Sequence, residues 1–345
     1  MKVDNQAFLE SVSRGLGGRV AVMKGYREAL EGSAAVHFDG NLINCMSNAS
    51  EMHLHTLAST LTRTSTDFWP NKPESHGLHL WTNAQVGLWF GQWVHPDWDM
   101  FQSGHAAGSY HAAGRAVSGG PVYVSDKPGA HNFDLLKKLV LPDGSVLRAD
   151  GPGVPTRDTL FTDPTRENVL LKIMNTLGGG AAGVLGLFNA RWEEGKELTS
   201  TGTFGPGDLH WSHPDGPFAV YLHQAGELLA MTGAERRDLT LGPLDWELAT
   251  FVPIEDGVAV LGFTHLFNGA AAVSAGWVGD DEILPIACRC GGRLLIYAER
   301  RPAMVHLWND DELPYSYNVE ARRLVIEVPE PDPLGTVSLS VTFAD

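Results

Sequence analysis

Short apolar runs alternate with longer amphipathic segments along the first part of the chain. Between residues 18 and 38, the apolar residues Val20, Met23, Tyr26 and Leu30 recur at three- and four-residue spacing, which predicts an amphipathic helix. The same reading predicts helices at residues 53–59, 77–93 and 106–117, and strands at residues 42–46, 60–65, 99–101 and 121–125. Strands that alternate with helices in this way are typical of β/α units with a parallel sheet.

The rest of the chain shows the alternation of half-buried strands. Val337, Leu339, Val341 and Phe343 alternate with serine and threonine, which is the period of a strand with one buried face. Further strands are predicted at residues 183–189, 218–223, 246–252, 258–263, 294–299 and 324–328. We therefore divide the chain into residues 1–148, built from β/α units, and residues 149–345, an antiparallel β-sandwich domain.

The composition and net charge of the chain exclude several classes of protein. The formal net charge is -16 and the sequence pI about 5.2, without a basic cluster, which excludes a nucleic-acid-binding surface and favours a neutral or cationic small ligand. No apolar stretch is long enough to span a membrane, and no signal peptide follows Met1. Cys45, Cys288 and Cys290 are odd in number, which favours a reducing compartment, so we expect a cytoplasmic location. The oligomeric state is left open.

Acidic residues recur at the ends of the predicted strands of residues 1–148. They are Asp4, Asp67, Asp97, Asp99 and Asp126. Carboxylates at the carboxyl ends of parallel strands form the catalytic face of (β/α)8 barrels, although each aspartate alone would also fit a turn or a helix N-cap. Trp69, Trp93 and Trp98 lie nearby in sequence and could stack on a sugar ring or belong to the core. Together these residues favour a sugar-like site.

No metal or other cofactor is expected. His76 and His79 are three residues apart, but they lack the accompanying glutamate and ligand spacing of a zinc hydrolase. We interpret the histidines of residues 1–148 as hydrogen-bonding groups in the core or at the rim, with His105 and His111 behind the site.

Several long segments resemble one known family. They are residues 41–47 (NLINCMS), 67–70 (DFWP), 96–101 (PDWDMF), 123–126 (YVSD) and 135–149. These segments closely resemble the raffinose synthase and seed-imbibition-protein branch of glycoside hydrolase family 36. The resemblance implies a retaining α-galactosidase or galactosyltransferase with a (β/α)8 barrel followed by a C-terminal β-domain. By the family's strand order, the chain would contain about strands 4 to 8, so we expect it to be an N-terminally truncated part of the barrel.

The resemblance also implies roles for particular residues. The family signature Lys-x-Asp matches Lys2-Val3-Asp4, with Asp4 as nucleophile, and Arg-x-x-x-Asp matches Arg63 to Asp67, with Asp67 as acid/base. Lys2 and Arg63 would donate hydrogen bonds to sugar hydroxyls, although Arg63 could instead form a structural ion pair. Cys45 matches a position that faces the sugar, or is simply a small buried residue.

Three further residues complete the predicted substrate-binding set. They are Trp69, Asp97 and Asp99. Asp97 and Asp99 are assigned hydrogen-bonding or rim roles and no direct part in catalysis.

The chemistry requires two carboxylates in any retaining enzyme of this kind. One is ionised and attacks the anomeric carbon, while the other, about 5 to 5.5 Å away, protonates the leaving oxygen. Their proton affinities must therefore be pushed apart, and Lys2 beside Asp4 favours the ionised form of the nucleophile.

Three functions remain open on the sequence. The first is hydrolysis of α-galactosides through a covalent galactosyl-Asp4 intermediate, which we favour because Thr66 replaces an acid found in many plant synthases. The second is galactosyl transfer from galactinol to sucrose, in which the acceptor sugar replaces water. The third is an inactive fragment, because a barrel without its first three strands would leave sheet edges unpaired.

Overall fold

The computed structural model describes residues 1–210, 216–276, 278, 282–309, 311–332 and 335–343. Its N-terminal part holds a small parallel sheet with the strand order β1-β2-β3-β4. The strands are β1 (Lys2–Val3), β2 (Ile43–Asn44), β3 (Leu61–Arg63) and β4 (His95–Asp97). Phe101 and Val124 add one parallel bridge, where the sequence predicts a strand at residues 121–125. Pro121, at the start of that segment, has no N–H to extend the pairing.

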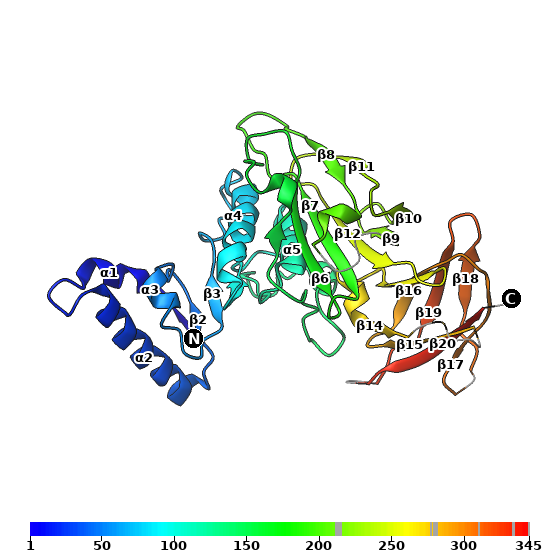
Figure 1. The fold of residues 1–345 in the computed structure, drawn as a ribbon, viewed down its shortest axis with the longest axis horizontal. Coiled ribbons are helices and arrows are strands. Elements are labelled where there is room, and N and C mark those ends of the chain that lie inside the picture. The colour runs from blue at the N-terminus through cyan, green and yellow to red at the C-terminus, as the bar shows by residue number, and fades with distance from the viewer. Residues whose placement is uncertain (211–215, 277, 279–281, 310, 333–334, 344–345) are drawn as a thin grey trace.

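Helices connect these strands (Figure 1). They are the 3-10 helix η1 (Gln6–Phe8) and the α-helices α1 (Leu9–Val12), α2 (Arg19–Phe38), α3 (Ser50–His53), α4 (Ser75–Phe90), α5 (Gly108–Ser118) and α6 (Phe133–Leu136). The helices predicted at residues 18–38, 77–93 and 106–117 are confirmed as α2, α4 and α5. Figure 1 shows α1 to α3 at one end of the molecule and the C-terminal sheets at the other.

The buried face of α2 differs from the apolar face expected from its sequence. Val20 is 54% exposed, whereas the buried positions include Arg27 and Glu31 one turn apart. Arg27 pairs with Glu31 and donates to Asn44 of β2 and to Ser59. The helix therefore packs on the sheet through a buried polar network, which hydrophobic periodicity does not report.

Two predicted elements are wrong in position. The helix expected at residues 53–59 is the shorter α3, because the N–H groups of Leu57 and Ala58 donate to the Glu31 carboxylate instead of continuing the helix. The strand expected at residues 99–101 is β4, which ends at Asp97. The Asp97 carboxylate accepts the Asp99 N–H at 2.9 Å, and Asp99 has a left-handed φ of 67°, so the backbone turns after the strand.

The C-terminal part of the chain is rich in antiparallel strands. One sheet has the order β10 (Glu227–Thr232), β9 (Pro217–Leu222), β12 (Trp246–Pro253), β7 (Ala182–Phe188), β6 (Leu171–Leu177) and β5 (Val154–Pro155). A pair joins β11 (Arg237–Leu241) and β8 (Ser200–Phe204). Another sheet has the order β13 (Val258–Phe263), β16 (Gly292–Ala298), β19 (Arg323–Val328) and β18 (Tyr315–Asn318). The last has the order β14 (Val273–Ala275), β15 (Ile283–Cys288), β20 (Val337–Phe343) and β17 (Pro302–Leu307). Short 3-10 helices lie at η2 (Arg157–Thr159), η3 (Pro206–Asp208) and η4 (Gly269–Ala272).

The strands predicted for this part are confirmed, with ends shifted by at most two residues.

Two of the buried apolar clusters in the described part of the chain are larger than the others. The sheets of β16 and β20 share one core, to which Leu294, Ile296, Leu339 and Val341 contribute. A second core joins the helices α4 and α5 to the six-stranded sheet, with members that include Leu80, Val117, Ile173 and Phe188. The β/α part therefore rests on the antiparallel sheet through α4 and α5. The domain boundary between residues 148 and 149 stays a prediction.

Candidate functional site

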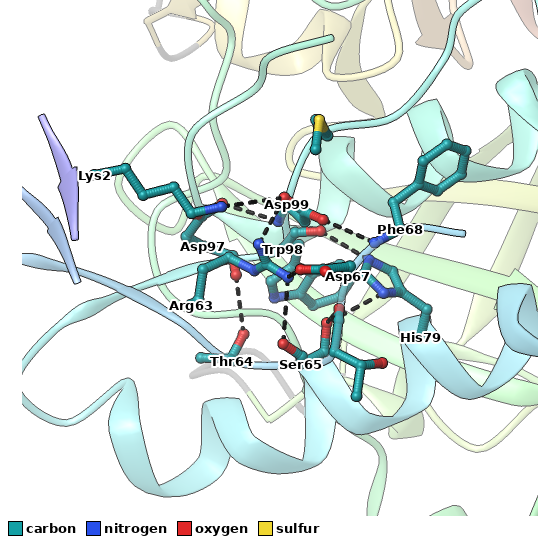
Figure 2. Close-up of polar contacts among 12 residues, drawn as sticks. Lys2, Arg63, Thr64, Ser65, Asp67, Phe68, His79, Asp97, Trp98 and Asp99 are labelled. Carbon is teal, nitrogen blue, oxygen red and sulfur yellow. Dashed lines mark hydrogen bonds and ion pairs between the residues drawn. The ribbon is translucent and has the colours of Figure 1, made fainter. Parts of the chain in front are cut away.

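Charged side chains gather where the parallel strands end (Figure 2). Arg63 is the last residue of β3 and Asp97 the last of β4, while Asp99 follows in the turn after β4. Lys2 lies on β1, and Figure 2 shows its ammonium group pointing toward Asp99. Parallel strands place their carboxyl ends on one edge of a sheet, which explains why residues far apart in sequence meet here.

The Asp99 carboxylate is the centre of this cluster. It is fully buried, and its Oδ1 accepts from Nη1 of Arg63 at 2.7 Å. Its Oδ2 accepts the backbone N–H of Phe68 at 2.8 Å, and Nζ of Lys2 lies 4.0 Å from Oδ1. Asp99 therefore connects β1, β3 and the loop after β3.

Asp97 is held by a tyrosine that the sequence analysis assigned no role. The phenol of Tyr123 donates to the two Asp97 oxygens at 2.8 and 3.1 Å, and Tyr123 also lies 3.4 Å from Asp99 Oδ1. Burial raises the pKa of Asp97, although Tyr123 and the Asp99 N–H oppose this by hydrogen bonding. Two signals in the sequence pointed to this residue, namely its place in the strand predicted at residues 121–125 and its place in the segment 123–126 that resembles the family.

Arg63 bridges a buried and an exposed carboxylate. Burial disfavours its charge, but Asp99, Cys45 and Asp97 raise the pKa of Arg63 above its ordinary value. Its Nη2 lies 3.2 Å from Oδ1 of Asp67, whose side chain is 59% exposed. The ion pair that the sequence left open for Arg63 is therefore present, and it places Asp67 next to the cluster.

Asp4 and Cys45 lie on neighbouring strands at the same edge. Asp4 follows β1 and is exposed, whereas Cys45 follows β2 and is buried. Burial and a hydrogen bond with Asp4 raise the pKa of the Cys45 thiol to about 11, while Arg63 and Lys2 act in the opposite direction. The thiol therefore stays protonated at neutral pH, beside Asp4 and within the field of both cations.

Two of the tryptophans considered for sugar stacking have clear places. Trp98 has no exposed surface, so of the two roles that the sequence left open, stacking on a sugar or a place in the core, it takes the second. Trp69 is 44% exposed, with the ammonium of Lys72 4.4 Å from its ring centroid. The backbone N–H of Phe68 donates to Asp99, and Trp69 is the next residue, so the backbone of Trp69 lies next to the cluster.

Asp126, the remaining strand-end carboxylate, belongs to a separate set of contacts. It accepts from the hydroxyl of Ser103 at 2.6 Å and lies 3.1 Å from His131. Across the described residues, no three His, Cys, Asp or Glu side chains are arranged to hold a metal ion. None of the described helices combines the length and hydropathy needed to cross a membrane.

Replacing His79 by Gln is expected to make the free energy of unfolding less dependent on pH. Burial lowers the pKa of His79 to about 3, so between pH 7 and 5 the unfolded chain binds a proton that the folded chain does not. Stability therefore falls as the pH falls, by about 2 kcal/mol at pH 5 for this one group. Glutamine cannot take up that proton.

Urea denaturation at pH 7 and pH 5 measures this difference. The exposed His37 provides the control, because His37→Gln removes a histidine without removing a buried one. An equal change in stability between the two pH values for wild type and His79→Gln contradicts the prediction.

Comparisons with known proteins give a consistent family. Residues 1–328 match the family model described as raffinose synthase or seed imbibition protein Sip1. A protein of Arabidopsis thaliana named "Probable galactinol--sucrose galactosyltransferase 1" is 40% identical over 93% of this chain and 46% of its own length. The galactinol–sucrose galactosyltransferase of Oryza sativa subsp. japonica is 36% identical over 95% of this chain and 46% of its own length. The chain thus spans less than half the length of either relative.

A solved α-galactosidase structure from Saccharomyces cerevisiae superposes with a TM-score of 0.49 at 10% sequence identity. The superposition covers 70% of this chain and 70% of the yeast chain. A likeness at that level does not define a site.

Proposed function

Because the chain belongs to the raffinose synthase or seed imbibition protein family, we propose that it carries the catalytic residues of a galactosyltransferase. In this proposal residues 1–148 are part of a (β/α)8 barrel. The parallel order of β1 to β4 and the parallel bridge at Phe101 support the barrel. The gathering of Lys2, Arg63 and Asp99 at the carboxyl ends of the strands supports a catalytic edge.

Asp4 and Asp67 carry the two half-reactions. In the first, an Asp4 oxygen attacks the anomeric carbon, the bond to the leaving oxygen breaks, and Asp67 supplies the proton to that oxygen. In the second, Asp67 takes the proton of an acceptor hydroxyl, whose oxygen displaces Asp4 from the anomeric carbon. Two inversions leave the galactosyl group in its original configuration. The Cys45 thiol, which shares a hydrogen bond with Asp4, lies within the positive field of Arg63 and Lys2, so cationic side chains are present on the Asp4 side of the edge.

The acceptor in this proposal is a sugar hydroxyl, with galactinol as donor and sucrose as acceptor. The single observation that carries this choice is the 40% identity, over 93% of the chain, to a relative named for that transfer. The sequence alone favoured hydrolysis because Thr66 precedes Asp67, and the relatives support transfer better than hydrolysis. Both reactions share the first half-reaction, so the two carboxylates are compatible with either.

Incubation with galactinol and sucrose tests the proposal. We expect raffinose to form faster than free galactose, measured by chromatography of the products. Free galactose as the main product, at the same sucrose concentration, would instead identify a hydrolase. A sample without sucrose measures the hydrolytic background.

The inactive-fragment alternative is favoured by a specific observation. In the described residues β1 pairs only with β2, and large apolar side chains of residues 1–38, such as Phe8, Leu16 and Val36, are exposed. The assay therefore includes a fusion of residues 1–345 behind the N-terminal portion of the Arabidopsis relative that this chain does not match. Transfer by the fusion but not by residues 1–345 alone supports this alternative for the isolated chain.

A further inference from the structure

A buried guanidinium lies beneath the turn that carries Asp99. Arg115 on α5 donates from Nη2 to the carbonyl oxygens of Trp98, Asp99 and Met100 at 2.7, 3.2 and 3.0 Å. Its Nε donates to the Asp99 carbonyl at 3.3 Å. Three consecutive carbonyls converge on one donor because the left-handed φ of 67° at Asp99 curls the backbone. Arg115 therefore stabilises a turn that extended backbone cannot form.

The shape of this turn decides where the Asp99 carboxylate points. The carboxylate accepts hydrogen bonds from Nη1 of Arg63 at 2.7 Å and from the backbone N–H of Phe68 at 2.8 Å. Phe68 is the residue that follows Asp67 in the chain. A change of φ at Asp99 would move both oxygens away from these donors. Arg63 and the start of the loop that carries Asp67 thus depend on a turn whose carbonyls are held by Arg115.

The other side of Arg115 is held by neutral histidines. Its Nη1 donates to Nδ1 of His111 at 2.8 Å, which leaves Nε2 of His111 as the donor to Nδ1 of His76, also at 2.8 Å. Nε2 of His79 donates to the Trp98 carbonyl at 2.8 Å. Burial lowers the pKa of all three histidines, so they orient the guanidinium without adding charge.

The charged guanidinium of Arg115 binds backbone carbonyls and forms no ion pair within the described residues. Burial lowers the pKa of Arg115 to about 10, although Asp99 and Asp97 raise it, so the side chain stays protonated at neutral pH. None of the ion pairs formed within the described part of the chain includes it. Its Cζ lies 5.5 Å from the centroid of the Phe101 ring, which closes one side of the site. Burying a cation without a carboxylate in direct contact costs desolvation energy, and the hydrogen bonds to the three carbonyls offset part of that cost.

We propose that Arg115 is a positioning residue for the candidate active site. It does not reach the substrate, and it acts through the turn at residues 98–100, which aims Asp99 at Arg63 and at the Phe68 N–H. The catalytic consequence rests on the proposed function, whereas the effect on the turn is a property of the chain itself.

Hydrogen exchange of residues 1–345, followed by mass spectrometry, tests the effect on the turn. In Arg115→Lys the charge remains, but one ammonium cannot donate to three carbonyls and to His111 in the same geometry. We expect peptides that cover residues 66–70 and 97–101 to exchange at least about tenfold faster, because the N–H groups of Phe68 and Asp99 lose their acceptors. Peptides from α5 and β7 should keep their protection.

Arg27→Lys is the matched control. Arg27 is also a buried arginine on a helix of the β/α part, but it contacts Glu31, Asn44 and Ser59. Its substitution should speed exchange near residues 57–58, whose N–H groups bind Glu31, and leave residues 66–70 unchanged.

Two results overturn the proposal. One is wild-type exchange at residues 66–70 and 97–101 in Arg115→Lys, and the other is a uniform increase that includes β7, which indicates a general loss of stability. If Arg115→Lys does not fold, His111→Leu keeps Arg115 but removes the acceptor of its Nη1, together with the hydrogen bond from His111 to His76. Wild-type exchange of the same peptides in that variant also overturns the proposal.

Kinetics supply the catalytic readout in whichever form of the protein transfers galactose. Arg115→Lys should lower kcat by about 10- to 100-fold, because the loop that carries the acid/base Asp67 is misplaced, and it should also raise KM, because Arg63 is assigned to the sugar hydroxyls. Equal kcat in the variant and wild type would contradict the catalytic part. Since exchange is measured without substrate, a wild-type chain without transferase activity refutes the proposed function and leaves the test of the turn intact.

Discussion

Replacing Asp4 by Asn is expected to reduce galactosyl transfer by at least about 10³-fold, because an amide cannot form the covalent intermediate on which both half-reactions depend. The substitution keeps the size of the side chain, and Asp4 is exposed, so the fold should be retained. Initial rates with galactinol and sucrose measure the loss, in residues 1–345 or in the fusion, whichever is active.

Two further measurements make this prediction specific to a nucleophile. Asp39→Asn is the control, because Asp39 is also an exposed aspartate of the β/α part, at the end of α2. It should retain wild-type rates. Azide added to Asp4→Asn should restore turnover and give a galactosyl azide of inverted configuration, since a single displacement replaces two. A rate within tenfold of wild type for Asp4→Asn rules Asp4 out as the nucleophile.

Replacing Asp99 by Asn is expected to lower the free energy of unfolding by about 3–5 kcal/mol, because it leaves the buried Arg63 cation without its closest anion. Arg63 is 2% exposed and Asp99 fully buried, with 2.7 Å between Nη1 and Oδ1. Asparagine also presents an NH2 group to one of the two donors that the carboxylate satisfied. Urea denaturation at neutral pH measures the change.

Asp67→Asn is a matched comparison for Asp99→Asn, since both carboxylates pair with the same guanidinium. The Asp67 side chain is 59% exposed and lies 3.2 Å from Nη2, so its ion pair is solvent-screened. We expect a change in stability below about 1 kcal/mol. Transfer should nevertheless fall sharply, because the acid/base is lost. Equal destabilisation by the two substitutions would show that burial does not set the strength of the Arg63 pairs.

Much of the fold could be predicted from periodicity. The helices α4 and α5 and the strands β7, β12, β16 and β20 bury recurring apolar residues, so their patterns indicated their type and position. The patterns did not indicate His79, His111 and Arg115, which α4 and α5 also bury. The prediction of the helix at residues 53–59 was wrong, because a buried carboxylate binds the backbone N–H groups there. The carboxylate of Glu31 ends α3 by binding the N–H groups of Leu57 and Ala58, and no hydrophobic pattern records such a bond.

The candidate site was predictable in its members and less so in its arrangement. Lys2, Arg63, Asp67 and Asp99 were selected from spacing and from resemblance, and the structure places them in contact or close to it. Tyr123 and Arg115 were missed, because each acts on residues 15 to 26 positions away that only the tertiary structure brings close.

The sequence by itself determined the alternation of strands and helices, the two signatures that contain Asp4 and Asp67, and the resemblance to one family, because these depend on neighbours within a few residues. Only the tertiary structure decided that Arg63 pairs with Asp99, 36 positions away, and that Trp98 lies in the core. It also decided that the buried guanidinium of Arg115 binds the turn at residues 98–100. The physical reason is that a buried charge takes its hydrogen-bond partner from a segment that lies beside it in the folded chain. The sequence around each of the two partners does not show which segments the sheet brings side by side.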